Sequence, residues 1–304
     1  MKVLNEAKLR SAIEKRMADD IAQNRVGGAS LLVVQDGKEI YRASFTNPQM
    51  AGQSVTEDTL YRLASMTKPI SGVAAMILVE RGLLRLDDTV ESYLGTFGDM
   101  LVLDGEGGTF PTDRRVTVRH LLTHTSGIGS GAAIDYSTSH RTSADLVDNA
   151  SYVRHLEQMP LSFVPGTRQE YSGIAAFSVL TAIIQKLSGL SYEEFLQKEI
   201  FRPLGMVDTT FVPSEAQRAR IIPMHDLVEG ECALGPTYEG CVFEQIPVTN
   251  FLGGAGLVSS TADYARFATM LLHGGDLRIV NDLPSFHRTI ITHAHNNFSF
   301  YFSI

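Results

Sequence analysis

The segment Arg62-Leu63-Ala64-Ser65-Met66-Thr67-Lys68-Pro69-Ile70 sets the first expectations for this chain. The apolar run over residues 70–79 predicts a buried helix, and Pro69 is tolerated only in the first turn of a helix, so Ser65 should lie at or beside the helix start. Lys68 follows Ser65 by three residues and therefore shares its helix face, within reach of the hydroxyl. The unpaired N–H groups and partial positive charge of a helix N-terminus favour an alkoxide or an acyl oxyanion at this place.

The Ser-x-x-Lys pattern is short and also has a purely structural interpretation. Serine is a common N-cap of solvated helices, and a lysine one turn later needs no function. The pattern alone therefore does not separate a nucleophile from a helix cap, and the surrounding sequence must decide.

Length and composition predict a large core and exclude some classes of partner. The chain has 304 residues, 44% of them hydrophobic, which is enough for one or two intertwined domains. The net charge is −8 and no cluster of Lys and Arg stands out, which argues against a nucleic-acid partner. The two cysteines, Cys232 and Cys241, fit neither a metal motif nor a disulfide scaffold.

The distribution of apolar residues argues against export and against a membrane partner. Residues 1–20 are charged and lack the apolar stretch of a signal peptide. No apolar run reaches about 18 residues without a charge or a break, so no membrane span is expected. These observations predict a cytoplasmic protein.

The order of the expected elements indicates an α+β fold. Apolar residues recurring every four positions predict an amphipathic helix over residues 4–23. Strands are expected over residues 29–34 and 39–45, and Asp36-Gly37 between them is a strong hairpin signal. Further helices are expected over residues 70–81, 86–94, 116–124, 144–158, 174–187, 192–200 and 260–272, whereas residues 95–113 and 125–143 read as loops.

This order predicts two structural parts. Residues 1–80 and 251–304 would form an antiparallel sheet flanked by helices, and residues 81–250 would form a mainly helical domain inserted between them.

Further blocks follow Ser-x-x-Lys in a characteristic order. They are Leu84-Arg85-Leu86-Asp87-Asp88, Val118-Arg119-His120-Leu121-Leu122-Thr123-His124-Thr125-Ser126-Gly127, Pro165-Gly166-Thr167, Tyr171-Ser172, Phe201-Arg202-Pro203-Leu204-Gly205-Met206, and residues 253–267. Blocks in this order are far more specific than Ser-x-x-Lys alone. Over roughly residues 5–275 the chain resembles the serine β-lactamase and penicillin-binding superfamily, most closely its class C-like branch of family VIII carboxylesterases and related acyltransferases.

The resemblance implies a β-lactamase/transpeptidase-like fold and an acyl-enzyme mechanism with no metal and no cofactor. Ser65 would be the nucleophile, activated by Lys68 and Tyr171, because a serine hydroxyl is a weak nucleophile at neutral pH. A neutral lysine base at pH 7 needs a pKa shift of about three units, roughly 4 to 5 kcal/mol, and a tyrosinate at Tyr171 is the alternative base. The sequence does not choose between them. Taken without the family, Tyr171 would read as an aromatic residue capping a core helix.

The chain departs from the family pattern at two motifs. The second motif reads Tyr171-Ser172-Gly173, where Tyr-x-Asn is usual in β-lactamases and peptidases, and the missing side-chain amide favours esters over β-lactams. The third motif, Lys or His followed by Ser or Thr and then Gly, has no match after Ser260. Loss of the oxyanion donor that its strand supplies typically costs about 100- to 1000-fold in rate.

The resemblance ends near residue 280, so the C-terminal strands of the sheet are expected to be incomplete. Residues 298–304 alternate apolar and polar side chains, which predicts a strand pairing with the open edge of the hairpin over residues 29–45. The competing interpretation is an unstructured, aggregation-prone tail.

Two other clusters have weaker functional interpretations. His120 and His124 are spaced like zinc ligands but lack the glutamate of His-Glu-x-x-His, and His293 and His295 lack a third ligand. The glycines over residues 253–256 match no phosphate-binding pattern and instead suggest a turn where the backbone approaches the site.

The sequence therefore predicts a serine hydrolase, a carboxylesterase acting on small acyl esters. An acyltransferase using the same acyl-enzyme is the near alternative, and a β-lactamase or D-alanyl peptidase is a further one. A non-catalytic homologue, with the first two motifs but an incomplete site, is the alternative from outside the enzymes.

Overall fold

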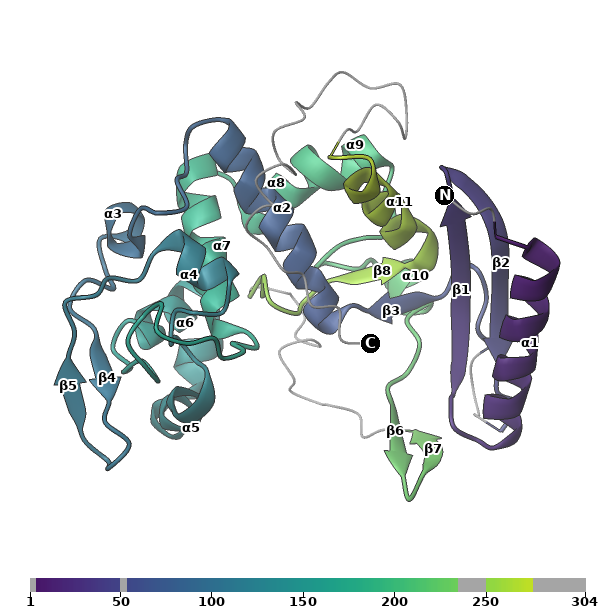
Figure 1. Ribbon diagram of the computed structural model, residues 1–304, viewed down its shortest axis with the longest axis horizontal. Helices are drawn as coiled ribbons and strands as arrows, with labels where there is room; N and C mark the ends of the chain where they lie inside the picture. Colours follow the sequence, from purple (N-terminus) through teal and green to yellow (C-terminus); the bar gives the residue numbers. More distant parts are fainter. Residues whose placement is uncertain (1–3, 50–53, 235–249, 276–304) are drawn as a thin grey trace.

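The computed structural model describes residues 4–49, 54–234 and 250–275, and it shows the mixed α+β architecture that the sequence predicts (Figure 1). Its helices are α1 (Glu6–Ala22), α2 (Thr67–Glu80), α3 (Val90–Leu94), α4 (Val118–Leu122), α5 (Gly131–His140), α6 (Asn149–Leu156), α7 (Ala175–Ser188), α8 (Tyr192–Leu196), α9 (Arg202–Leu204), α10 (Glu215–Arg218) and α11 (Thr261–Leu272). There are also the short 3₁₀ helices η1 (Ala64–Met66) and η2 (Ser143–Leu146) and the short π-helix η3 (Gln197–Phe201). Its strands are β1 (Gly28–Gln35), β2 (Lys38–Thr46), β3 (Leu60–Arg62), β4 (Leu101–Leu103), β5 (Thr109–Pro111), β6 (His225–Val228), β7 (Glu231–Leu234) and β8 (Val258–Ser260).

The N-terminal helix and hairpin are confirmed. Strands β1 and β2 pair antiparallel, and helix α1 packs against β2. Asp36 and Gly37 at the turn have φ of +51° and +76°, and positive φ at both central residues is what a tight hairpin turn matching the strand twist requires. Figure 1 shows this unit at one end of the molecule, with α11 beside β1.

A short pair of strands joins two distant parts of the chain next to Ser65. Strand β3 pairs antiparallel with β8, in the register Leu60↔Ser260, Tyr61↔Ser259 and Arg62↔Val258. The chain leaves β3 directly into η1 and α2, so this pairing fixes where the helix that carries Lys68 begins.

The core lies where helices α2 and α7 pack together. Both helices are apolar on most faces, and α4, α6 and α8 pack around α7. A helix that is apolar all round must be enclosed by other elements, and residues 70, 74, 179, 180 and 183 are fully buried. The core therefore holds α2, and with it Ser65 and Lys68, rigidly against the start of α7.

Three sequence predictions are wrong in detail. Residues 125–143 contain helix α5, which has Gly, Ser and Thr in its sequence but buries Ala133 and Ser137. Residues 95–113 contain the β4–β5 hairpin. The helix expected over residues 144–158 is interrupted, because Asp148 caps a new helix by accepting the N–H of Ser151. In each case tertiary packing or a local cap outweighs composition.

Some predictions remain untested by the structure. The expected strand over residues 298–304, the incomplete sheet and the pair His293 and His295 lie outside the described residues. Within the described parts, none of the helices is both long enough and apolar enough to cross a bilayer. The cytoplasmic location stays a prediction.

A buried hydrogen-bond chain gives the first test of this packing. Tyr192 donates to Ser71 Oγ at 2.6 Å, and Ser71 donates to the Gly253 carbonyl at 2.6 Å, so the chain links α8, α2 and the loop before β8. We expect Tyr192→Phe and Ser71→Ala each to lower the free energy of unfolding by about 1 to 2 kcal/mol in urea titrations. The double variant should cost less than the sum, because both substitutions break one chain. Strict additivity would contradict this linkage.

Candidate active site

Ser65 is held at a sharp turn between a strand and a helix. Ala64 before it has φ of +46°, an uncommon value for a residue other than glycine. The Leu63 N–H donates to the Leu257 carbonyl at 2.8 Å, and the Tyr264 hydroxyl donates to the Met66 carbonyl at 3.1 Å. Ser65 is exposed in spite of these anchors. The turn therefore presents its hydroxyl to solvent on a fixed backbone.

Lys68 is buried in the first turn of α2, and only 7% of it is exposed. Its Nζ donates to the Gly173 carbonyl at 2.6 Å, to the Gly254 carbonyl at 2.8 Å and to Ser65 Oγ at 3.2 Å. An ammonium group has three N–H donors, so these three acceptors satisfy it completely. The lysine can stay charged in this buried place only because of them.

Tyr171 approaches Ser65 from the loop before α7. Its Oη lies 2.5 Å from Ser65 Oγ, and Lys68 Nζ lies 4.8 Å from the centre of its ring. The tyrosine is 54% exposed, so one side of the phenol faces solvent. The structure thus brings together all three residues that the sequence analysis selected.

The environment moves the pKa values of Lys68 and Tyr171 in the same direction. Burial lowers the pKa of Lys68 from its ordinary 10.5, although hydrogen bonding with Tyr171 opposes the change. Burial raises the pKa of Tyr171, but hydrogen bonds with Lys68 and Ser65 and the lysine charge outweigh it, and the net pKa is below 10.0. Both groups therefore lose a proton more easily than free side chains do.

Two backbone carbonyls, those of Gly173 and Gly254, belong to the site as acceptors for Lys68, and the motif analysis did not identify them. Gly173 and Gly254 meet so closely that a Cβ on Gly254 would lie 2.8 Å from the Gly173 carbonyl oxygen. The glycine run over residues 253–256 is thus the turn that was expected to let the backbone approach the site. In the sequence, the glycine run was the signal for this close approach of the backbone. The acceptors for Lys68 are main-chain carbonyl oxygens, which no residue type identifies.

The histidine pair is used for hydrogen bonds to the backbone. His120 Nδ1 accepts the N–H of Thr117 at 3.2 Å, and His124 Nδ1 accepts the N–H of Ser172 at 3.2 Å. Among the described residues there is no group of three or more His, Cys, Asp or Glu side chains that could hold a metal ion. His124 contacts the Tyr171 ring, a neighbour that sequence reasoning missed.

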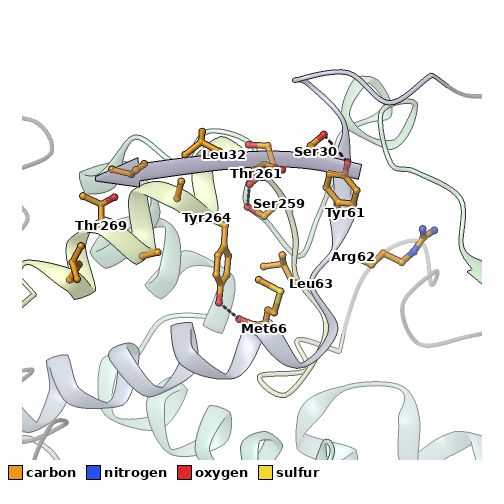
Figure 2. Close-up of a pocket in the computed structure, with 15 residues that line it drawn as sticks. Ser30, Leu32, Tyr61, Arg62, Leu63, Met66, Ser259, Thr261, Tyr264 and Thr269 are labelled. Atoms are coloured by element: carbon orange, nitrogen blue, oxygen red, sulfur yellow. Dashed lines mark hydrogen bonds between the residues drawn. The ribbon is translucent and has the colours of Figure 1, made fainter. Parts of the chain in front are cut away.

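A groove of about 760 Å³ lies beside the turn that carries Ser65, between β1, β3 and α11 (Figure 2). Its walls are mostly apolar and include Leu32, Leu63, Met66 and Tyr264, while Ser65 is not among them. Figure 2 shows Tyr264 reaching from α11 across the groove to Met66. Through Leu63 and Met66, the groove therefore borders the turn that carries Ser65 and extends from there along α11.

Comparison with known proteins identifies the family. The model of the Beta-lactamase family matches residues 9–287. The chain belongs to this family. It is 34% identical over 289 residues to esterase EstB of Burkholderia gladioli, covering 86% of the chain and 70% of that protein. It is 31% identical over 253 residues to penicillin-binding protein 4 of Amycolatopsis lactamdurans, covering 83% of the chain and 61% of that protein.

The solved structures agree on the fold. The structure of EstCE1, described as a hydrolase with promiscuous acyltransferase activity, superposes with a TM-score of 0.76 at 22% identity, covering 90% of this chain and 75% of that one. The fold is therefore β-lactamase/transpeptidase-like, and the resemblance found in the sequence motifs is confirmed. The chain spans less than two thirds of the length of penicillin-binding protein 4.

The Gly173 and Gly254 carbonyls together form a cradle for the Lys68 ammonium group. Gly254→Ala and Gly173→Ala form a matched test of this lysine cradle. The new methyl group at 254 would press on the Gly173 carbonyl at 2.8 Å, whereas the one at 173 meets no atom of the described residues within 4 Å. We expect Gly254→Ala to lower ester turnover by about 10- to 100-fold, because the displaced carbonyl no longer orients Lys68. Gly173→Ala should stay within about twofold of the wild type. Equal losses in both variants would contradict the assigned cradle.

The lowered pKa values predict the pH dependence of turnover. Acylation needs a pair that has lost one proton, so kcat/KM should rise with pH and level off, with its midpoint below 10.0. Measured with a nitrophenyl ester and corrected with Ser65→Ala, Lys68→Arg should lose the rising limb where the lysine is the group that deprotonates and keep it where Tyr171 is, because arginine does not deprotonate. A profile that falls with pH would show that the protonated pair is the active form.

Proposed function

We propose that this chain is a serine esterase that cleaves small acyl esters through an acyl-enzyme on Ser65. One observation carries the proposal: Ser65 Oγ lies 2.5 Å from Tyr171 Oη and 3.2 Å from Lys68 Nζ. A hydroxyl in contact with two groups of lowered pKa is the arrangement expected of an activated nucleophile. The family and the name of EstB agree with this chemistry.

The geometry suggests how the proton moves. If Lys68 gives up one proton, its two remaining N–H groups stay on the carbonyls of Gly173 and Gly254, and its lone pair faces Ser65 Oγ. If Tyr171 gives up its proton, the phenolate faces the same hydroxyl at 2.5 Å while Lys68 stays charged. Both states hold one proton fewer than the resting pair, and both accept the Ser65 proton.

The reaction then takes two steps. Ser65 Oγ attacks the ester carbonyl carbon while its proton passes to the Lys68–Tyr171 pair, and collapse of the tetrahedral intermediate breaks the bond to the alkoxy oxygen, which leaves with that proton. Water repeats the sequence on the acyl-enzyme and releases the acid. The exposed side of Tyr171 leaves this second step open to solvent.

Two features favour esters over amides and β-lactams. Gly173 supplies only a backbone carbonyl at the place where peptidases of this family carry a side-chain amide, and that carbonyl is occupied by Lys68. An ester also offers a better leaving group than an amide and therefore needs less protonation help. A β-lactamase or D-alanyl peptidase remains the further alternative.

Acyl transfer is the second candidate function, and the exposure of Tyr171 favours it. A phenol that is 54% exposed lets an alcohol acceptor approach the acyl-enzyme from the same side as water. Transfer and hydrolysis share every step up to the acyl-enzyme, so partitioning depends on the acceptor that binds next. EstCE1, described as having promiscuous acyltransferase activity, has the same fold.

Mass spectrometry of the intact protein tests the nucleophile directly. After exposure to a fluorophosphonate or a short-chain nitrophenyl ester, we expect one adduct on the wild type and none on Ser65→Ala, because the alanine variant has no nucleophile. Lys68→Ala and Tyr171→Phe should label at least about 100-fold more slowly. Circular dichroism of each variant controls for folding.

Each outcome has a definite meaning. A well-folded wild type that forms no adduct would refute the esterase and support a non-catalytic homologue. An adduct that decays faster with added alcohol, with ester as the new product, would identify a transferase. Hydrolysis of a β-lactam faster than of esters would support the lactamase alternative.

A further inference from the structure

His124 contacts the backbone on both sides of Tyr171. Its carbonyl oxygen accepts the N–H of Glu170 at 2.9 Å, and its Nδ1 accepts the N–H of Ser172 at 3.2 Å. One residue of the loop after α4 thus binds the residues immediately before and after the tyrosine. The φ of His124 is +57°, and such a backbone is kept only where the surroundings hold it in place.

The imidazole ring also packs against the tyrosine itself. The ring centres of His124 and Tyr171 are 4.7 Å apart, with a 42° angle between their planes. The ring centre of Phe177, which belongs to α7, lies 5.6 Å from that of His124. Lys68 Nζ faces the rings of Tyr171 and Phe177 at 4.8 and 5.5 Å. The phenol is therefore enclosed between the histidine and the lysine, apart from its exposed side.

The charge state of His124 suits a role in support of Tyr171. Burial and the nearby charge of Lys68 lower the pKa of His124 from 6.5 to about 4, so the ring is neutral at neutral pH. Nδ1 accepts a hydrogen bond, and the ring proton therefore resides on Nε2. A neutral ring adds no second positive charge beside Lys68.

We propose that His124 is a positioning residue, which holds the Tyr171 hydroxyl against Ser65 mainly by fixing the backbone at 170 and 172, with the packing of its ring on the phenol as a lesser contact. It acts through Tyr171 and touches no reacting atom. The kinetic part of its test rests on the proposed esterase function, whereas the spectroscopic part does not. The competing explanation is a general structural contact between two loops, which would affect stability alone.

The variants separate the two contacts of the side chain. His124→Phe keeps an aromatic ring against Tyr171 but removes the acceptor for the Ser172 N–H. His124→Asn keeps an acceptor close to the position of Nδ1 and tolerates a positive φ. His120→Asn is the matched control, because the His120 imidazole makes the same kind of bond, to the Thr117 N–H at 3.2 Å, within the cap of α4.

The kinetic expectation concerns turnover per active site. With sites counted by fluorophosphonate titration, kcat of His124→Phe should fall about 10- to 100-fold, while KM changes by no more than about twofold. His124→Asn should recover most of this loss, and His120→Asn should resemble the wild type. A loss of stability with unchanged kcat per site would refute the positioning role.

The spectroscopic expectation concerns the titration of Tyr171. Carbon-13 labelling of the tyrosine ring, with Tyr171→Phe to assign the signal, gives the pKa of this phenol without any substrate. We expect that pKa to return toward about 10 in His124→Phe, since the phenol moves away from Lys68, and to stay low in His124→Asn. An unchanged pKa in His124→Phe overturns the inference, even in an active enzyme.

The two measurements keep the proposals apart. A wild type without ester turnover, whose Tyr171 pKa still depends on residue 124, would refute the esterase and support the positioning role. An active wild type in which neither kcat nor the Tyr171 pKa responds to His124→Phe would support the esterase and refute the positioning role.

Discussion

The buried ammonium group of Lys68 is the constraint on which the rest of the site depends. A buried charge is tolerated only when its hydrogen-bonding groups are satisfied, and here the acceptors are the Gly173 and Gly254 carbonyls and the Ser65 hydroxyl. These acceptors come from three distant parts of the chain. The pairing of β3 with β8 and the packing of α2 on α7 therefore serve to bring one lysine and its acceptors together.

The same constraint explains the proposed chemistry. Each proton that Lys68 donates to a carbonyl is fixed by the backbone, so only the third, directed at Ser65 Oγ, is free to move. Tyr171 shares that hydroxyl. Burial would raise the pKa of Tyr171, but its hydrogen bonds with Lys68 and Ser65 and the charge of Lys68 lower it. Whether the mobile proton leaves from the lysine or from the tyrosine changes the assignment of the base, but not the number of protons on the pair.

The sequence predicted the parts of the site that depend on side-chain identity. Ser65, Lys68 and Tyr171 were selected from their motifs, and the structure places them together. The hairpin turn was predicted from Asp36-Gly37, because few residues adopt its backbone conformation. The main-chain acceptors were not predicted, because every residue has a carbonyl oxygen and the sequence does not single one out. The contacts of His124 were not predicted, because contacts between loops depend on tertiary packing. Helix α5 was missed for a related reason, since burial of Ala133 outweighs its polar composition.

Gly173 stands where β-lactamases and peptidases of the family usually carry a side-chain amide. Its residue type does not reveal that its backbone contacts Lys68. The glycine brings no amide, but its backbone carbonyl lies 2.6 Å from Lys68 Nζ, so an acceptor for the lysine is present. A Cβ at this position would meet no atom of the described residues within 4 Å, so a side chain there would project into open space. Glycine at this position therefore leaves the acceptors of Lys68 intact. Under the proposed esterase function, the missing amide is what an acyl-enzyme site adapted to esters is expected to show.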